Sequence, residues 1–177
     1  NPVGMSAMQS PQWALHHPIA PPFLSFHSNS VVQRHVHAFF LGKFVQTDAI
    51  LGLNVKDRVF TFFFIDDAIG FQFQHWLSQL HVLAYNNELE RLVRKTPMEQ
   101  KTHAYLLNQT LTTFQQITDK AFNRKNALEV KIAELTKEFG EQSPAAKAAQ
   151  YQLDQLLNTN AIGYLAEECF LPTAGLP

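Results

Sequence analysis

The sequence has one cysteine, few glycines and little charge, and each shortage excludes a class of protein. The single Cys169 excludes an internal disulfide framework and a multi-cysteine zinc site, so we expect a reduced, cytoplasmic setting. The net charge of −1 provides no overall field for nucleic acid or an acidic membrane, so any such contact has to be a local patch. The apolar run VFTFFFI at 59–65 is far shorter than the roughly 20 residues of a membrane span, and we expect no membrane partner.

Phosphate-binding glycine motifs are also missing. The chain has neither a G-x-x-x-x-G-K-[ST] loop nor a G-x-G-x-x-G turn, whose backbone N–H groups cradle nucleotide phosphates. We therefore expect that this chain alone does not hydrolyse ATP and carries no cofactor. No catalytic residue is predicted elsewhere. Cys169 lies beside Glu167 and Glu168, without the positive neighbours that activate a thiolate. Asp66 or Asp67 is expected to cap the helix that follows.

The eight histidines do not form a recognisable metal site. Two ligands to one ion on a helix lie three or four residues apart, so that both side chains face the same way. The histidine pairs have other spacings: His16/His17, His35/His37 and His75/His81. We expect no bound metal and interpret these residues as hydrogen-bonded or surface histidines.

Composition divides the chain into three segments. Residues 1–27 carry no Asp, Glu, Lys or Arg but contain five of the nine prolines, which predicts an extended Pro-rich leader that lies along another surface. Residues 28–96 are expected to form an aromatic-rich helical subdomain with one short strand, and residues 97–177 a long helical hairpin with a C-terminal connector. The chain begins with Asn1 rather than Met and ends in PTAGLP, so we expect a piece of a longer protein.

The middle segment is predicted to begin with an amphipathic helix that Ser28 or Ser30 caps and that ends near Gln46. The β-branched and aromatic run RVFTFFFI at 58–65 predicts a strand. A single strand needs a partner, and FLSF at 23–26 is the only good candidate in the chain. Two further helical patterns follow, one over 71–85 and one over 87–95 that continues it or stands alone.

A heptad pattern dominates the last segment. A 4,3,4,3 spacing of mostly apolar residues runs from Leu107 to Phe139, with polar breaks at Thr118 and Lys125, and predicts a long helix with an apolar seam. Gly140 ends this helix, and Pro144 suits the first turn of a second helix, predicted over 145–168. We expect an antiparallel hairpin in which each helix covers the other's apolar stripe. A coiled coil that binds a partner or a second copy is the alternative. The predicted fold class is mainly α, a helical bundle with a long antiparallel helical hairpin and at most a small β element.

Two stretches resemble a known family. WALHHPIAPPFLSFHSNSVVQRHVHAFFLGKFV at 13–45 resembles a P-x-x-P…S-x-x-V-x-Q-R-H-V-N-A segment. That segment follows the second RecA-like domain of large bacterial DEAD/DEAH-box helicases with a C-terminal DUF1998 (MrfA- or DrmA-like) module. AEECFLPTAGLP at 166–177 resembles the GFLP…FP segment with which those proteins continue toward that module. The two stretches cover about a quarter of the chain, and His37 stands where the family pattern has Asn.

The resemblance implies a non-catalytic accessory or linker region of an ATP-dependent superfamily 2 DNA helicase or translocase, in DNA repair or phage defence. The parent protein would then bind ATP and Mg²⁺, and the partners would be DNA and the RecA-like motor domains of the same polypeptide. Arg34, His35 and Lys43 are the residues expected to contact DNA phosphates or the motor. A structural or interaction protein that acts through its hairpin is the rival hypothesis. A small-ligand binder that uses the Phe-rich half is the third.

Overall fold

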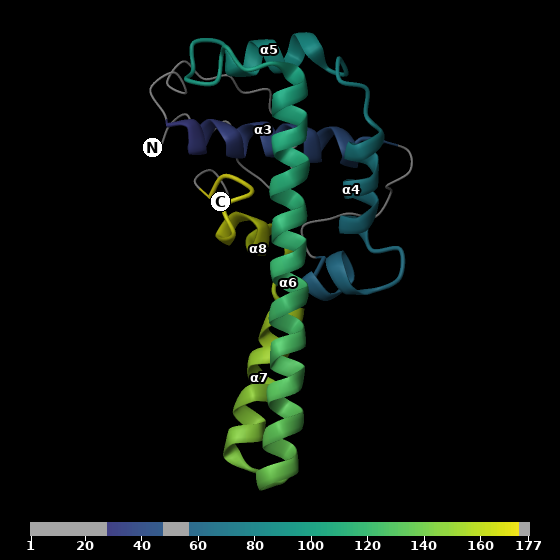
Figure 1. The fold of residues 1–177 in the computed structure, drawn as a ribbon, viewed down its shortest axis with the longest axis vertical. Coiled ribbons are helices and arrows are strands. Elements are labelled where there is room, and N and C mark those ends of the chain that lie inside the picture. Colours follow the sequence, from purple (N-terminus) through teal and green to yellow (C-terminus); the bar gives the residue numbers. More distant parts are fainter. Residues whose placement is uncertain (1–27, 48–56, 174–177) are drawn as a thin grey trace.

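The computed structural model describes residues 28–47 and 57–173, which form a helical bundle with a long antiparallel hairpin (Figure 1). This confirms the mainly α fold class. The elements are α3 (Asn29–Val45), the π-helical turn η2 (Phe60–Phe64), α4 (Ile69–Gln79), α5 (Asn86–Val93), α6 (His103–Phe139), α7 (Pro144–Asn158) and α8 (Ala161–Glu167). No strand forms within the described ranges, where one isolated antiparallel bridge joins Arg58 and Asn160. The predicted leader 1–27, with FLSF at 23–26, lies outside the described residues.

Helix α6 is the long axis of the molecule. Its 37 residues, at 1.5 Å per residue, span about 55 Å. Helix α7 runs beside its distal half, whereas α3, α4, α5 and α8 lie around its proximal half (Figure 1). We call residues 122–158 the hairpin and the remaining described residues the body. The hairpin projects from the body, so its outer faces are open to solvent.

Local signals set the turn of the hairpin, as predicted. Gly140, with a φ of 94°, follows the last residue of α6. The Ser143 hydroxyl accepts a hydrogen bond from the N–H of Ala146, and Pro144 occupies the first turn of α7. The two helices pack on each other within the chain, which confirms the intramolecular hairpin.

The heptad seam of α6 is buried next to the body and exposed at the tip. Phe114 and Ala121 are 0% exposed and Leu128 is 9% exposed, whereas Phe139 is 59% exposed. Helix α7 begins only after a four-residue turn, so it leaves the last turn of the seam partly uncovered. Burial therefore weakens along the hairpin toward its tip.

The predicted helix over 145–168 is two helices. Helix α7 ends at Asn158, and the side chain of Asn160 starts α8 by accepting a hydrogen bond from the N–H of Gly163. Between them, Thr159 is extended, and its carbonyl accepts a hydrogen bond from the N–H of Val59 at 2.8 Å. A contact with a distant segment, together with the asparagine cap, overrides the local helical pattern.

The predicted strand over 58–65 is wrong. Residues Phe60–Phe64 form a π-helical turn, and only Arg58 makes a β-bridge. No neighbouring strand is present among the described residues to pair with this run. Burial of phenylalanine rings fixes the turn instead. Phe62 is 0% exposed and Phe63 5% exposed, and both rings pack against Phe114 of α6. The run is apolar because it enters the core, not because it belongs to a sheet.

Two further boundaries differ from prediction. Helix α4 begins after Ala68, so neither Asp66 nor Asp67 caps it. Asp67 has a φ of 56° and accepts a hydrogen bond from the Gln72 side chain through its backbone carbonyl. The helix predicted over 71–85 ends at Gln79, where Leu80 turns extended, and α5 is a separate helix.

One apolar core joins the elements of the body. It extends along the sequence from Val32 to Leu171 and includes residues of both predicted segments, 28–96 and 97–177. Helix α3 lies inside it and is buried on most of its circumference, since nine of its residues are buried: Val32, His35, Val36, His37, Ala38, Phe40, Leu41, Gly42 and Phe44. In the ranges that the structure describes, no helix combines the length and apolar character needed to cross a membrane.

Candidate functional site

Helix α3 carries the three residues expected to contact DNA or a motor domain. His35 is buried, 7% exposed, and Arg34 is half-buried. Arg34 and Lys43 are nine residues apart, which places them on nearly opposite sides of a regular helix. The structure therefore does not gather the three side chains on one face. Their contact with DNA or a motor domain stays a prediction.

The Lys43 side chain forms an ion pair with another residue of the body. Its Nζ atom lies 2.7 Å from a carboxylate oxygen of Glu88 in α5. The same ammonium lies 5.4 Å from the ring centre of Phe39 and 5.2 Å from that of Tyr85. With a side chain only 22% exposed, Lys43 joins α3 to α5, and Glu88 offsets its charge.

His37 is a buried junction that the sequence did not identify. Its Nδ1 atom lies 2.8 Å from the carbonyl oxygen of Phe170, and its Nε2 atom 3.1 Å from the side-chain oxygen of Gln109. Its ring stacks on Phe170 with centres 4.4 Å apart and planes 9° apart. Burial, the largest effect, lowers the pKa of His37, and the positive charge of Arg34 lowers it further, although both hydrogen bonds raise it. The ring is therefore neutral near pH 7.

A neutral imidazole carries one N–H group and can donate only one hydrogen bond. The Phe170 carbonyl can only accept, so the proton belongs on Nδ1 of His37. The amide of Gln109 can present either an oxygen or an NH₂ group to the other nitrogen. This network holds the segment after α8 against α3. The only sequence signal for it was a histidine in an apolar helix.

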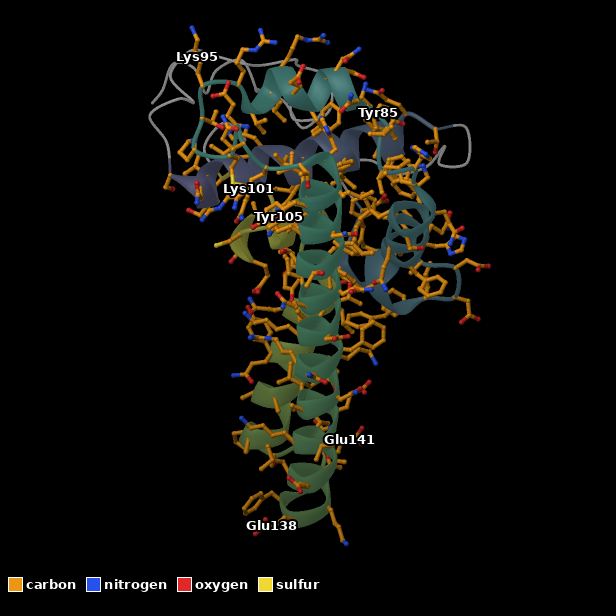
Figure 2. The ribbon with its side chains drawn as sticks, turned by 45° about the horizontal axis from the view of Figure 1, so that its top comes forward. Tyr85, Lys95, Lys101, Tyr105, Glu138 and Glu141 are labelled. Carbon is orange, nitrogen blue, oxygen red and sulfur yellow. The ribbon has the colours of Figure 1, made fainter. Side chains whose placement is uncertain are left out.

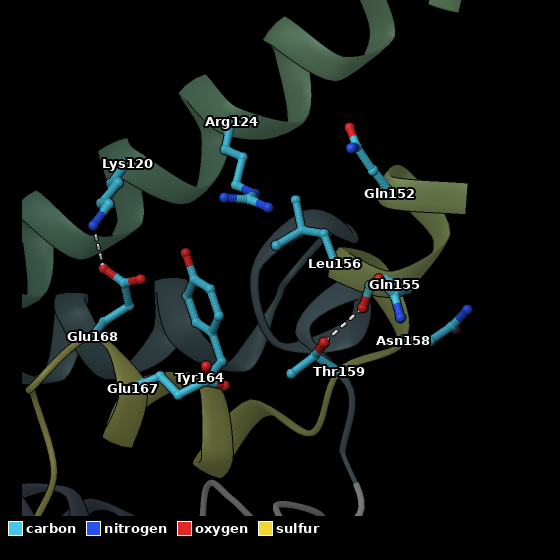
Figure 3. A pocket seen from close by; sticks show the side chains of 10 residues that line it. All are labelled: Lys120, Arg124, Gln152, Gln155, Leu156, Asn158, Thr159, Tyr164, Glu167 and Glu168. Carbon is cyan, nitrogen blue, oxygen red and sulfur yellow. Dashed lines mark hydrogen bonds and ion pairs between the residues drawn. The ribbon is translucent and has the colours of Figure 1, made fainter. Parts of the chain in front are cut away.

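A groove opens where α6, α7 and α8 meet, with a volume of about 800 Å³ (Figure 3). Ten residues from these helices and their ends line it, all but Leu156 of them polar: Lys120, Arg124, Gln152, Gln155, Leu156, Asn158, Thr159, Tyr164, Glu167 and Glu168. Tyr164 forms its floor, with a buried ring and a hydroxyl that points toward α6 between Lys120 and Arg124 (Figure 3). Burial, aided by Glu168, raises the pKa of Tyr164, while Arg124 opposes the shift. The phenol is therefore neutral at neutral pH.

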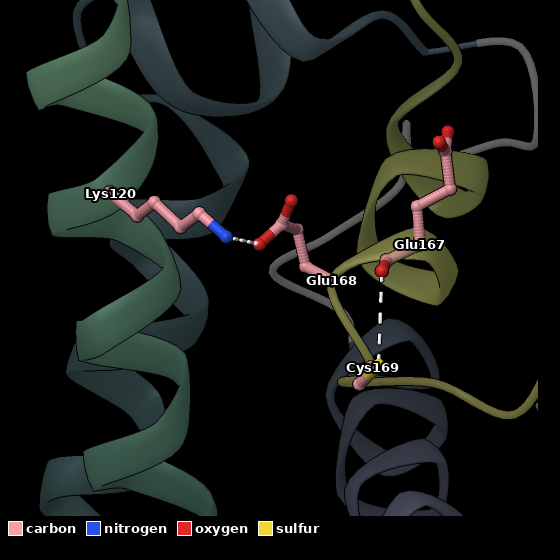
Figure 4. A network of polar contacts seen from close by, with 4 residues as sticks. All are labelled: Lys120, Glu167, Glu168 and Cys169. Atoms are coloured by element: carbon pink, nitrogen blue, oxygen red, sulfur yellow. Dashed lines mark hydrogen bonds and ion pairs between the residues drawn. The ribbon is translucent and has the colours of Figure 1, made fainter.

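An ion pair closes one side of the groove. Lys120 Nζ lies 2.7 Å from Glu168 Oε1, and the lysine side chain is 66% exposed (Figure 4). Such an exposed pair contributes roughly 0 to 1 kcal/mol to stability. Cys169 follows at a φ of 66°, and its thiol donates a long contact of 3.8 Å to the carbonyl of Glu167. The exposed thiol therefore lies beside backbone rather than beside a base.

Hydrogen-bonding groups of both charges line the groove. Two cations and two carboxylates line it, so it has no excess of either charge. No Ser, Cys or His side chain lines it, and the Thr159 hydroxyl is already bonded to the Gln155 carbonyl at 2.6 Å. Among the described residues, no three His, Cys, Asp or Glu side chains come together in a way that could hold a metal ion. The lining residues therefore do not include a Ser–His or Cys–His pair of the kind that activates a nucleophile.

Comparisons with protein-family models, curated proteins and solved structures found no match for this chain. The sequence could not predict the groove, because its lining comes from three helices whose relative positions no local pattern fixes.

Proposed function

We propose that this chain is a non-catalytic accessory or linker region of an ATP-dependent superfamily 2 DNA helicase or translocase. One observation supports this most directly. The two stretches that resemble such helicases, 13–45 and 166–177, contact each other through His37 and Phe170. A bundle placed between a motor and a C-terminal module is accommodated most easily when its entry and exit segments lie close together.

The chemistry of the described residues is consistent with a supporting role. The groove offers hydrogen-bonding groups without a Ser–His or Cys–His pair, and the sequence has no phosphate-binding glycine loop. ATP and Mg²⁺ would therefore be bound by the RecA-like motor domains of the same polypeptide. DNA repair and phage defence in the bacterial cytoplasm are the settings that the resemblance implies.

The coding sequence around this chain tests the proposal. We expect the gene to encode a RecA-like motor with nucleotide-binding motifs before Asn1 and a cysteine-containing module after Pro177. A gene that encodes no RecA-like motor on the amino-terminal side would contradict the proposal, whatever the chain itself binds.

The second candidate function is a protein-interaction domain that acts through the hairpin. The projection of the hairpin from the body favours it, as do three exposed apolar side chains: Val130 at 56%, Phe139 at 59% and Tyr151 at 63%. Stable self-association in solution would favour this candidate over the helicase region.

A further inference from the structure

A basic segment lies at the end of the body opposite the hairpin tip. Four of the fourteen Lys and Arg residues of the chain fall within residues 91–101, and all four are exposed: Arg91, Arg94, Lys95 and Lys101. We call these four side chains the basic surface. Figure 2 shows Lys95 and Lys101 at this end and Glu138 and Glu141 at the opposite tip. Charge is therefore distributed unevenly along a chain whose net charge is close to zero.

Few carboxylates offset the basic surface. Within residues 86–101, Glu88 is paired with Lys43, which leaves the exposed Glu90 and Glu99. None of the four cations makes an ion pair with a described residue. The hairpin is different, because it contains five Lys and Arg residues and an equal number of Asp and Glu residues. The basic surface is thus a part of the described chain where positive charge is in local excess.

Hydrogen bonds and burial hold this segment in a fixed conformation. The Thr96 hydroxyl donates to the Val93 carbonyl at 2.6 Å and accepts from the N–H of Met98 at 3.2 Å. All three residues are buried, so they anchor the exposed cations to the core. Lys101 is positioned further by Tyr105, whose ring centre lies 4.7 Å from its Nζ atom. A segment whose backbone is anchored in this way loses less conformational entropy on binding than a mobile one.

We propose that the basic surface binds the phosphodiester backbone of DNA. Exposed cations on an anchored segment, without ion pairs among the described residues, suit a polyanion with regularly spaced charges. Such contacts position a protein on DNA without reading its sequence. The choice of DNA rests on the proposed function, but the charge argument does not. The contact surface is then formed by α5 and the turn after it, not by α3, where Lys43 is paired with Glu88.

Fluorescence anisotropy with labelled single-stranded and duplex DNA tests the proposal on the full 177-residue chain. With four phosphate contacts, the logarithm of the association constant should fall against the logarithm of salt concentration with a slope of about −3 for single strands and about −4 for duplex. The double variant Arg94→Ala/Lys95→Ala should bind more weakly and lose about 2 from that slope. The matched variant Lys131→Ala/Lys137→Ala removes two exposed hairpin charges and should bind like the wild type.

Unchanged thermal midpoints of both variants, measured by circular dichroism, show that the fold is intact. Equal weakening by the two variants, or no salt-dependent binding to either DNA, overturns the proposal. A gene without a RecA-like motor would remove the helicase role but leave this surface assignment standing. If the gene encodes a RecA-like motor but the chain does not bind DNA, the surface assignment is wrong and the helicase role still stands.

Discussion

At the scale of single residues, His37 has the most consequential environment in the body. It joins α3 to Phe170, 133 residues further along the chain, by one hydrogen bond and a stacked ring. A buried polar ring of this kind is favourable only while its nitrogens are paired, since an unpaired buried group costs roughly 1 to 3 kcal/mol. His37 therefore links the first described helix to the last described segment.

Replacing His37 should make the body less stable. We expect His37→Ala to lower the free energy of unfolding by about 3 kcal/mol, because it removes the stacked ring and leaves the Phe170 carbonyl without its donor. Urea denaturation followed by circular dichroism measures the change. The control is His75→Ala, which removes an exposed histidine from α4 and should alter stability by less than about 0.5 kcal/mol.

The same urea denaturation, repeated at lower pH, tests how the lowered pKa of His37 affects stability. The pKa of His37 lies below its ordinary value of 6.5 in the folded state, so the unfolded chain binds more protons as the pH falls through 6.5. Stability should therefore decrease on acidification from pH 7.5 to 5.5, and His37→Ala should lose less stability over that interval than the wild type. Equal losses in both proteins would show that His37 does not contribute to the pH dependence.

At the scale of elements, η2 and α4 approach each other closely at Gly70. A Cβ atom at Gly70 would lie 2.9 Å from the carbonyl oxygen of Phe62 and 2.9 Å from its ring atom Cε1. Phe62 is fully buried and packs on Phe114, so it has little room to move. The first turn of α4 can approach the π-helical turn only because residue 70 has no side chain.

Adding one methyl group at that position should disturb the contact. We expect Gly70→Ala to lower the free energy of unfolding by about 1 to 3 kcal/mol through overpacking, measured by chemical denaturation. Gly163→Ala is the matched control in α8, where the nearest atom to the new Cβ would be Asn160 Oδ1 at 3.7 Å. It should be neutral or stabilising by up to about 1 kcal/mol. A Gly70→Ala variant as stable as the wild type would mean that the two elements can move apart freely.

At the scale of the whole molecule, the two ends of the described chain differ in charge. The end formed by α5 and the following turn has excess positive charge, whereas the hairpin is balanced in charge and exposes its last seam residue, Phe139. Val130 and Phe139 lie nine residues apart on α6 and therefore on nearly opposite sides of the helix. Scattered apolar residues of this kind do not form the continuous patch that a stable interface requires.

The chain should therefore be a monomer. Light scattering coupled to gel filtration, at several protein concentrations, should give the mass of one 20.1 kDa chain throughout. A dimer that Phe139→Ser dissociates, while the surface variant Lys131→Ala leaves it intact, would contradict this and favour the interaction-domain candidate. Phe139 is exposed, so its replacement leaves the core unchanged.

The sequence by itself determined the hairpin. The heptad period, Gly140 and the Ser143–Pro144 pair act through neighbours a few residues away, so their effects can be deduced without knowing the rest of the fold. Tertiary structure alone decided the π-helical turn at 60–64, the junction at His37 and the groove, and it acted with the Asn160 cap to break the helix at Thr159. These depend on segments far apart in the chain, where the burial of rings and the pairing of distant backbone groups outweigh local propensity.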